Sequence, residues 1–260
     1  MAETIPLRFA GVGRIARLRE LTGRDEYGVK GASTGNAIAL LDSLLESDPV
    51  TGAIEPPAAD LVAADRDRLL AVVYKRAFGD RIESTLICAR CREPFDLHFS
   101  LDRLIDSVSE AKSDVGWRVL EDGRFEVANG VTFRLPTGKD ELVGDALSPA
   151  EAESLLQSRC IVEGIWSENH VGFQELLEQV APLIDLELGA QCPECNHAQA
   201  VEFDIQTYVL GSIVAERRRL LTEINRIAKA YSWSLEEILS LSRSDRRQFV
   251  QLIESELLTC

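Results

Sequence analysis

Histidine, cysteine and methionine are scarce in this chain of 260 residues, which has three, six and one of them. None of the histidines, His98, His170 and His197, stands in an H-E-x-x-H or nucleophile-elbow motif, so the common hydrolase templates do not apply. We therefore predict no catalytic residues and no enzymatic activity.

Six cysteines are also too few for a fold held together by disulfides.

Long hydrophobic runs are also missing. No stretch reaches the roughly 18 uninterrupted apolar residues that a membrane helix needs. Residues 1–21 lack the compact apolar core and the small-residue cleavage site of a secretory signal. We therefore expect no membrane insertion and a cytoplasmic location.

Positive charge is in the minority. Lys and Arg number 28 against 43 Asp and Glu, which gives a formal net charge of −15. Such a chain repels a polyphosphate backbone unless its basic residues are segregated. The basic cluster Arg217–Arg219 could face nucleic acid, an acidic protein surface or solvent, but Glu216 and Glu223 interrupt it. We do not expect nucleic acid as a partner.

Helical patterns dominate both ends of the chain. The predicted helices share amphipathic periodicity or a capping motif and cover residues 36–46, about 60–78 with a stop at Gly79, 148–164, 174–180, 208–231 and two stretches that begin at Ser234 and Ser242. A proline-rich loop, residues 47–60, follows the first helix. The apolar stripe with Trp233 and Phe249 indicates packing into the core, with partner docking as the alternative.

The centre of the chain changes to strand patterns. Residues 83–101 and 183–205 each predict two short strands joined by a C-x-x-C turn, and Asp122-Gly123 and Asn129-Gly130 mark hairpin turns between them. We predict an α+β fold with helical N- and C-terminal regions around a small antiparallel β region with a zinc-ribbon-like site. The regions are 1–80, 81–207 with inserted hairpins and a helix, and 208–260.

Four of the six cysteines form the two C-x-x-C pairs, Cys88 with Cys91 and Cys192 with Cys195. Aligned on these pairs, both segments have phenylalanine eight residues after the second cysteine and then turn helical, which is a weak internal repeat. Two such turns facing each other supply the closed tetrahedral shell of four sulfurs that a structural Zn²⁺ prefers. We predict that these four cysteines bind one zinc ion.

Other readings of the cysteines remain open at this point. The pairs could be redox-active motifs or incidental, and His197 could replace one thiol as a ligand. Cys160 is expected to be a small buried residue within a helix. Cys260, at the C-terminus, is expected to be an exposed thiol.

The order of five segments resembles the zinc-binding baseplate proteins of contractile phage tails and phage-tail-like contractile injection systems, which are related to the T-even phage baseplate hub assembly family. The segments are LRELTGRDE (18–26), FGDRIESTLICARC (78–91), FRLPTGKDEL (133–142), CPECNHAQAVEFDI (192–205) and AKAYSWSLEEILSLSRSDRRQFVQLI (228–253).

This resemblance implies a non-enzymatic component of the baseplate hub with hub, spike or tail-tube proteins as partners. It implies that Cys88, Cys91, Cys192 and Cys195 are the zinc ligands, whereas Arg92 and Asn196 stand where glycine often follows the second cysteine. It leaves open phage or injection system, and assembly factor or permanent part of the particle. The alternative is a zinc-ribbon regulator that binds nucleic acid or the transcription machinery.

Overall fold

The computed structural model describes residues 3–9, 14–47, 57–109, 116–128, 130–145, 147–166 and 172–259. His170, Cys260, Asn129 of one predicted turn and most of the predicted loop 47–60 lie outside these residues. No helix within the described ranges is both long and apolar enough to cross a membrane.

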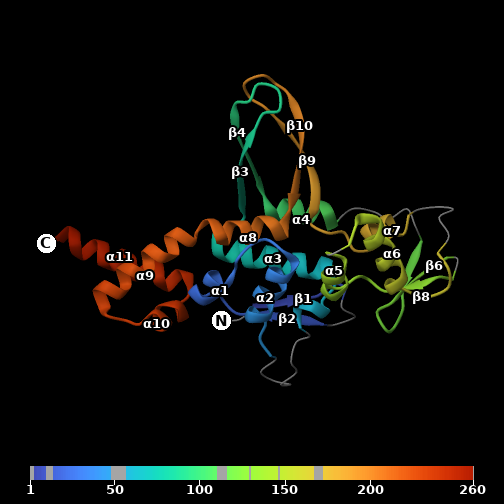
Figure 1. The fold of residues 1–260 in the computed structure, drawn as a ribbon, viewed down its shortest axis with the longest axis horizontal. Helices are drawn as coiled ribbons and strands as arrows, with labels where there is room; N and C mark the ends of the chain where they lie inside the picture. Colours follow the sequence, from blue (N-terminus) through green and yellow to red (C-terminus); the bar gives the residue numbers. More distant parts are fainter. Residues whose placement is uncertain are drawn as a thin grey trace. The chain divides into compact units, whose positions relative to one another are not determined.

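The chain has the α+β composition that the sequence predicts, with many helices and only small antiparallel sheets (Figure 1). The helices are α1 (Gly23–Gly28), α2 (Thr34–Leu44), the 3₁₀ turn η1 (Ala58–Asp60), α3 (Ala63–Phe78), α4 (Leu101–Ser109), α5 (Gly138–Gly144), α6 (Pro149–Cys160), α7 (Phe173–Val180), α8 (Ile205–Ala215), α9 (Arg217–Tyr231), α10 (Leu235–Ser240) and α11 (Arg243–Thr259). The strands are β1 (Glu3–Pro6), β2 (Ile15–Leu18), β3 (Arg81–Ile87), β4 (Pro94–Ser100), β5 (Trp117–Val119), β6 (Phe125–Val127), β7 (Thr132–Phe133), β8 (Ile161–Glu163), β9 (Asp185–Gln191) and β10 (Ala198–Asp204).

The chain forms two compact units. Unit 1 comprises Met1–Ile5, Ala16–Glu55 and Gln206–Cys260, and unit 2 comprises Pro6–Ile15 and Pro56–Ile205. The division into 1–80, 81–207 and 208–260 stays a prediction.

Capping residues set the ends of several helices where the sequence places them. The α3 helix ends at Gly79, whose φ of +96° favours a residue without a Cβ. The α6 helix begins after Ser148, whose capping box with Glu151 is formed and whose next residue is Pro149.

Two predicted helix boundaries are wrong. The α6 helix ends at Cys160 rather than Gly164, because residues 161–163 pair with β7 as strand β8. The predicted helix 208–231 starts earlier and is divided into α8 and α9 by a turn at Glu216. Periodicity alone does not reveal either the competing strand pairing or the turn.

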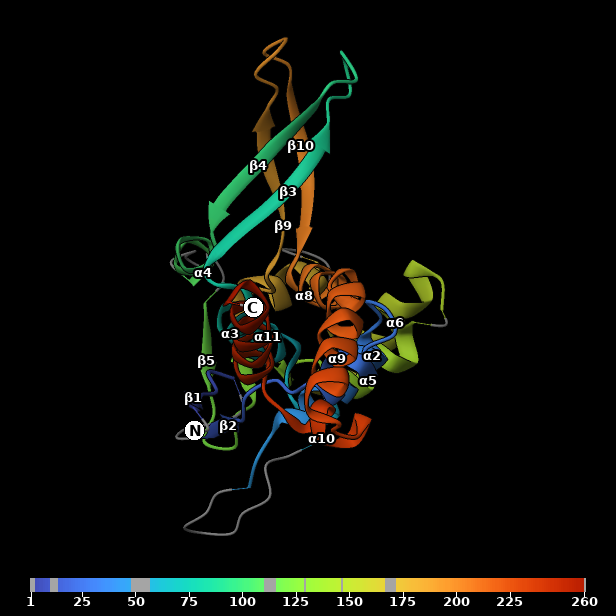
Figure 2. The same cartoon turned by 90° about the vertical axis from the view of Figure 1, so that its left-hand side faces the viewer.

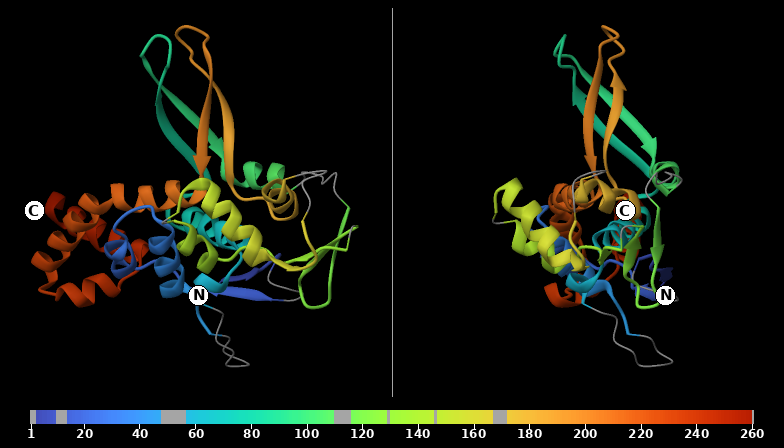
Figure 3. Two further views of the ribbon diagram at one scale, coloured as in Figure 1. Left: turned by 45° about the vertical axis from the view of Figure 1, so that its right-hand side comes forward. Right: turned by 90° about the vertical axis from the view of Figure 1, so that its right-hand side faces the viewer.

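Unit 2 contains an aromatic core and two long hairpins. Phe125, Phe133 and Phe173 form successive ring contacts 5.5 and 5.9 Å apart between centroids, beside the four-stranded sheet β5-β6-β7-β8. The hairpins β3-β4 and β9-β10 run side by side (Figures 2 and 3).

Unit 1 contains the helices α1, α2 and α9 to α11. The ring centroids of Trp233 and Phe249 lie 5.0 Å apart in an edge-to-face contact, and Ile238 of α10 is fully buried. These contacts confirm that apolar residues of the C-terminal segment pack within their own unit, although Leu235 stays 56% exposed.

A charged turn organises unit 1 around α1. The carboxylate of Asp25 accepts hydrogen bonds from the backbone N–H and hydroxyl of Thr22 and two from the guanidinium of Arg19, at 2.7 to 2.9 Å. The next residue, Glu26, pairs with Arg246 of α11, and both side chains are buried.

The same turn recurs in unit 2 around α5. Asp140 accepts from the N–H and hydroxyl of Thr137 and twice from Arg134, at 2.7 to 3.1 Å. The next residue, Glu141, pairs with Arg66 of α3. The sequences TGRDE (22–26) and TGKDE (137–141) therefore build equivalent structures, one in each unit.

Candidate metal centre

Two hairpins of identical length carry the four cysteines. The ladder β3-β4 runs from Arg81↔Ser100 to Ile87↔Pro94, and the ladder β9-β10 runs from Asp185↔Asp204 to Gln191↔Ala198. Each has seven residue pairs and a six-residue loop, and one constant shift in numbering takes Cys88 to Cys192 and Cys91 to Cys195. The weak repeat seen in the sequence is therefore a full structural repeat.

The first loop is a tight turn closed by backbone hydrogen bonds. The N–H of Cys88 donates to the carbonyl of Glu93 and the N–H of Arg92 donates to the carbonyl of Cys88, both at 3.0 Å. Arg92 has a left-handed φ of +65°. The backbone N–H of Cys91 points at the Cys88 sulfur, 3.5 Å away.

The second loop repeats this geometry. The N–H of Cys192 donates to the carbonyl of His197 and the N–H of Asn196 donates to the carbonyl of Cys192, both at 2.9 Å. Asn196 has a φ of +56°. Both residues that follow a second cysteine are thus left-handed, a conformation that asparagine tolerates better than arginine.

The loops bring the four sulfur atoms into one cluster. The Sγ atoms of Cys88 and Cys195 are 3.6 Å apart, those of Cys91 and Cys192 are 3.7 Å apart, and all four lie within 4.8 Å of one another. These separations far exceed the roughly 2.05 Å of a disulfide bond, and the cysteines are free thiols. The four cysteines together can bind a metal ion.

The thiols of the cluster differ in acidity. Hydrogen bonds, the first of them from the N–H of Cys91, lower the pKa of Cys88 to about 6. For Cys91, an N–H donated by Glu93 lowers the pKa, but burial and the neighbouring sulfurs outweigh it and raise the pKa to about 12. Several thiolates at this spacing repel one another, so a bound cation is what allows all four to ionise.

A small apolar cluster and one amide support the sulfurs. Cys88 and Cys192 are fully buried beside Phe95 and Ala190. The side chain of Gln199 on β10 links the hairpins, since it accepts from the N–H of Ala89 at 2.9 Å and donates to the carbonyl of Ile87 at 3.3 Å.

The other candidate residues of the sequence lie outside the cluster. His197 contributes its carbonyl to the turn and is not part of the sulfur cluster, and His98 is exposed on β4. Cys160 is fully buried at the end of α6, as expected, and burial raises its pKa to about 11. Among the described residues, no second group of histidine, cysteine and acidic side chains is arranged to hold an ion.

Sequence reasoning missed Gln199 and the repeated TGRDE and TGKDE turns. Gln199 replaces Phe95 in the repeat, and only the pairing of the two hairpins reveals its role. The turns, by contrast, are visible as a repeated pentapeptide preceded at the same distance by Arg19 and Arg134.

Comparisons with known proteins add no relative. No protein-family model matches the chain, and no curated protein or solved structure gives a significant match.

Proposed function

We propose that Cys88, Cys91, Cys192 and Cys195 bind one structural zinc ion. A tetrahedron of sulfurs with zinc–sulfur bonds of about 2.3 Å has sulfur–sulfur edges of about 3.8 Å. Two of the sulfur pairs, Cys88–Cys195 at 3.6 Å and Cys91–Cys192 at 3.7 Å, are close to this edge. Thiolate ligands in such a shell favour zinc over harder cations such as magnesium and calcium.

The proposed role of the ion is structural because four protein ligands fill its coordination shell. Catalytic zinc keeps a position for water or substrate. The complete burial of Cys88 and Cys192 supports the same assignment. We propose that the protein is not an enzyme.

The proposed zinc acts as a clamp between distant parts of the chain. A two-stranded hairpin alone is marginally stable in water, and both hairpins have alternating, largely exposed faces. Zinc bound between them converts two weak hairpins into one supported arm, so that metal affinity contributes directly to folding.

We further propose that this arm belongs to an assembly or structural component of a contractile-tail baseplate hub, in a phage or an injection system. The segments with family resemblance support this, because they include the two C-x-x-C turns and the two charged turns. The partners would be hub, spike or tail-tube proteins, met in the cytoplasm during assembly.

Co-expression with any tail-tube, spike and hub proteins that the neighbouring genes encode tests the assignment. The protein should co-purify with at least one of them and remain bound at high salt. Salt-sensitive binding to duplex DNA, without association with any tail protein, would instead support the zinc-ribbon regulator. The single observation that carries the zinc-clamp proposal is the four-sulfur cluster built from two equivalent hairpins.

A further inference from the structure

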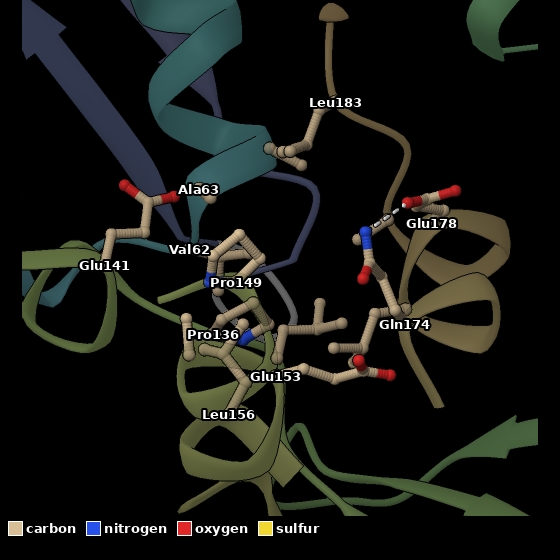
Figure 4. A pocket seen from close by; sticks show the side chains of 15 residues that line it. Val62, Ala63, Pro136, Glu141, Pro149, Glu153, Leu156, Gln174, Glu178 and Leu183 are labelled. Carbon is tan, nitrogen blue, oxygen red and sulfur yellow. Dashed lines mark hydrogen bonds between the residues drawn. The ribbon is translucent and has the colours of Figure 1, made fainter. Parts of the chain in front are cut away.

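Unit 2 contains an apolar cavity of about 340 Å³ between the start of α3, helix α6 and helix α7 (Figure 4). Its walls include Val62, Ala63, Pro136, Leu156 and Leu183. Among the described residues that line it are three carboxylates, Glu141, Glu153 and Glu178, and no lysine or arginine. Glu153 and Glu178 are exposed, so the cavity opens to solvent beside negative charge.

Unit 1 contains a structural equivalent of the part of the cavity wall formed by Ala63 and Glu141. The N–H of Gly138 donates to Leu61 in unit 2 at 3.2 Å, as the N–H of Gly23 donates to Leu241 in unit 1 at 3.1 Å. Two residues after Leu61, Ala63 is the first residue of α3. Two residues after Leu241, Arg243 is the first residue of α11.

A second pair of backbone bonds fixes this correspondence. The N–H of Ala63 donates to Pro136 at 3.2 Å, and the N–H of Arg243 donates to Leu21 at 3.3 Å. Ala63 thus occupies in unit 2 the position that Arg243 occupies in unit 1.

Arg243 shows what the equivalent position accepts. Its guanidinium donates to Glu26 at 3.1 Å and to Glu216 at 2.7 Å, and its side chain is only 8% exposed. Glu26 therefore binds two arginines, Arg243 and Arg246.

The equivalent glutamate of unit 2 meets a different environment. Glu141 pairs with Arg66, the counterpart of Arg246, but Ala63 brings no counterpart of Arg243. The side chain of Glu141 is 25% exposed and lines the cavity. Burial, with Asp145 and Asp140 nearby, raises the pKa of Glu141 despite Arg66, so a second cation would stabilise its charged form.

We propose that this cavity binds an arginine side chain from a partner protein, which takes the place that Arg243 fills in unit 1. The guanidinium bonds to Glu141, and the methylene stem packs between the apolar walls. The rim carboxylates Glu153 and Glu178 favour a basic segment with apolar neighbours. This inference goes beyond the zinc clamp. None of the described residues that line the cavity is a cysteine, so the two proposals can fail separately.

The test uses two peptides that differ in one charge. The probe is acetyl-Leu-Arg-Leu-amide, and the control carries citrulline in place of arginine, which keeps the shape and removes the charge. Full-length protein with carbon-13-labelled alanine methyl groups is titrated with each peptide. Ala63, Ala64, Ala152 and Ala181 line the cavity, whereas Ala37 and Ala190 are internal references outside it.

The arginine peptide should shift the cavity methyl signals saturably, with a dissociation constant on the order of 1 mM. It should bind at least about 5-fold more tightly than the citrulline peptide, since the charged pair is the stronger contact. Ala63→Arg, which supplies the arginine in cis, should abolish binding at Ala64, Ala152 and Ala181.

Three results would overturn the proposal: equal binding of both peptides, no saturable shift of the cavity signals, or undiminished binding to a folded Ala63→Arg variant. If Ala63→Arg does not fold, Glu141→Gln carries the test. This variant should weaken binding of the arginine peptide and leave binding of the citrulline peptide unchanged. Equal effects on the binding of both peptides would contradict the role of Glu141.

Discussion

The sulfur of Cys88 lies 3.6 Å from the sulfur of Cys195, although 107 positions separate them in the chain. The equivalent pair, Cys91 and Cys192, is 3.7 Å apart. One hairpin therefore meets its own repeat across the cluster, and each C-x-x-C turn supplies half of the proposed shell.

The left-handed Arg92 should cost stability. A non-glycine residue at a φ of +65° is strained, so Arg92→Gly should raise the free energy of unfolding by about 0.5–1 kcal/mol in denaturant titrations. Arg90→Gly is the matched control, since Arg90 is in the same turn and is not among the described residues with positive φ. Equal effects of the two substitutions would contradict the strain.

The charged turn of unit 2 should depend on Asp140. Burial opposes ionisation, but the hydrogen bonds from Arg134 and Thr137 outweigh it and lower the pKa of Asp140 to about 2. This is below the unfolded value of about 3.9, so the stabilisation is complete above about pH 4 and is lost as pH falls toward 2. Asp140→Asn should destabilise by about 1–3 kcal/mol at pH 7 and progressively less below pH 4.

Urea unfolding of the parent and of Asp140→Asn between pH 2 and pH 7 measures this difference. Asp25→Asn provides the parallel experiment in unit 1, where the pKa of Asp25 is also lowered. A difference that does not shrink in acid would show that the substitution acts through packing and not through charge.

Asp67 should make the protein less stable as pH rises. Burial raises its pKa to about 7, although its carboxylate accepts from the N–H of Ile184 at 2.9 Å. Because this exceeds the unfolded value of about 3.9, the folded state holds the proton more tightly, and stability falls as pH rises from about 4 to about 7.

Asp67→Asn keeps the acceptor and removes the titration. The variant should gain on the order of 4 kcal/mol over the parent at pH 8 and little at pH 4. Comparing parent and variant at each pH cancels the titration of the cysteines, which both proteins share. A gain that is equal at both pH values would contradict a titrating Asp67.

Gly23 should be required by the approach of Arg246. A Cβ at Gly23 would lie 2.9 Å from Nη1 of Arg246 and 3.3 Å from the Cα of Leu239. Gly23→Ala should therefore cost about 1–3 kcal/mol in thermal or chemical unfolding. Gly28→Ala, at the other end of the same helix with open space around it, should cost little, and an equal loss would disprove the steric cause.

The sequence predicts those parts of the structure whose signals are local. The C-x-x-C turns, the α6 capping box at Ser148 and the glycine stop at Gly79 each depend on a few neighbouring residues, and the structure has all of them. The short helix α1 is only six residues long, so its sequence has no periodicity to detect. Contacts from Arg19 and Arg246 to Asp25 and Glu26 hold it in place.

Other features follow from pairing between distant residues. The strand β8 ends α6 early because it pairs with β7, and Gln199 acquires its role only when the two hairpins meet. The proposed arginine-binding role of the cavity in unit 2 depends on a comparison of Ala63 with Arg243, which requires knowledge of the charged pairs around Glu141 and Glu26.

Zinc content of the purified full-length protein, measured by mass spectrometry of the metal, tests the central claim most directly. We expect about one zinc per chain. Cys88→Ser and Cys192→Ser should lose the metal and about 3 kcal/mol or more of stability, since metal binding contributes to folding. Cys260→Ser removes a thiol that is not one of the four proposed ligands and should lose neither. If the parent protein contains no metal, and if both cluster variants are as stable as the parent, the zinc clamp is contradicted.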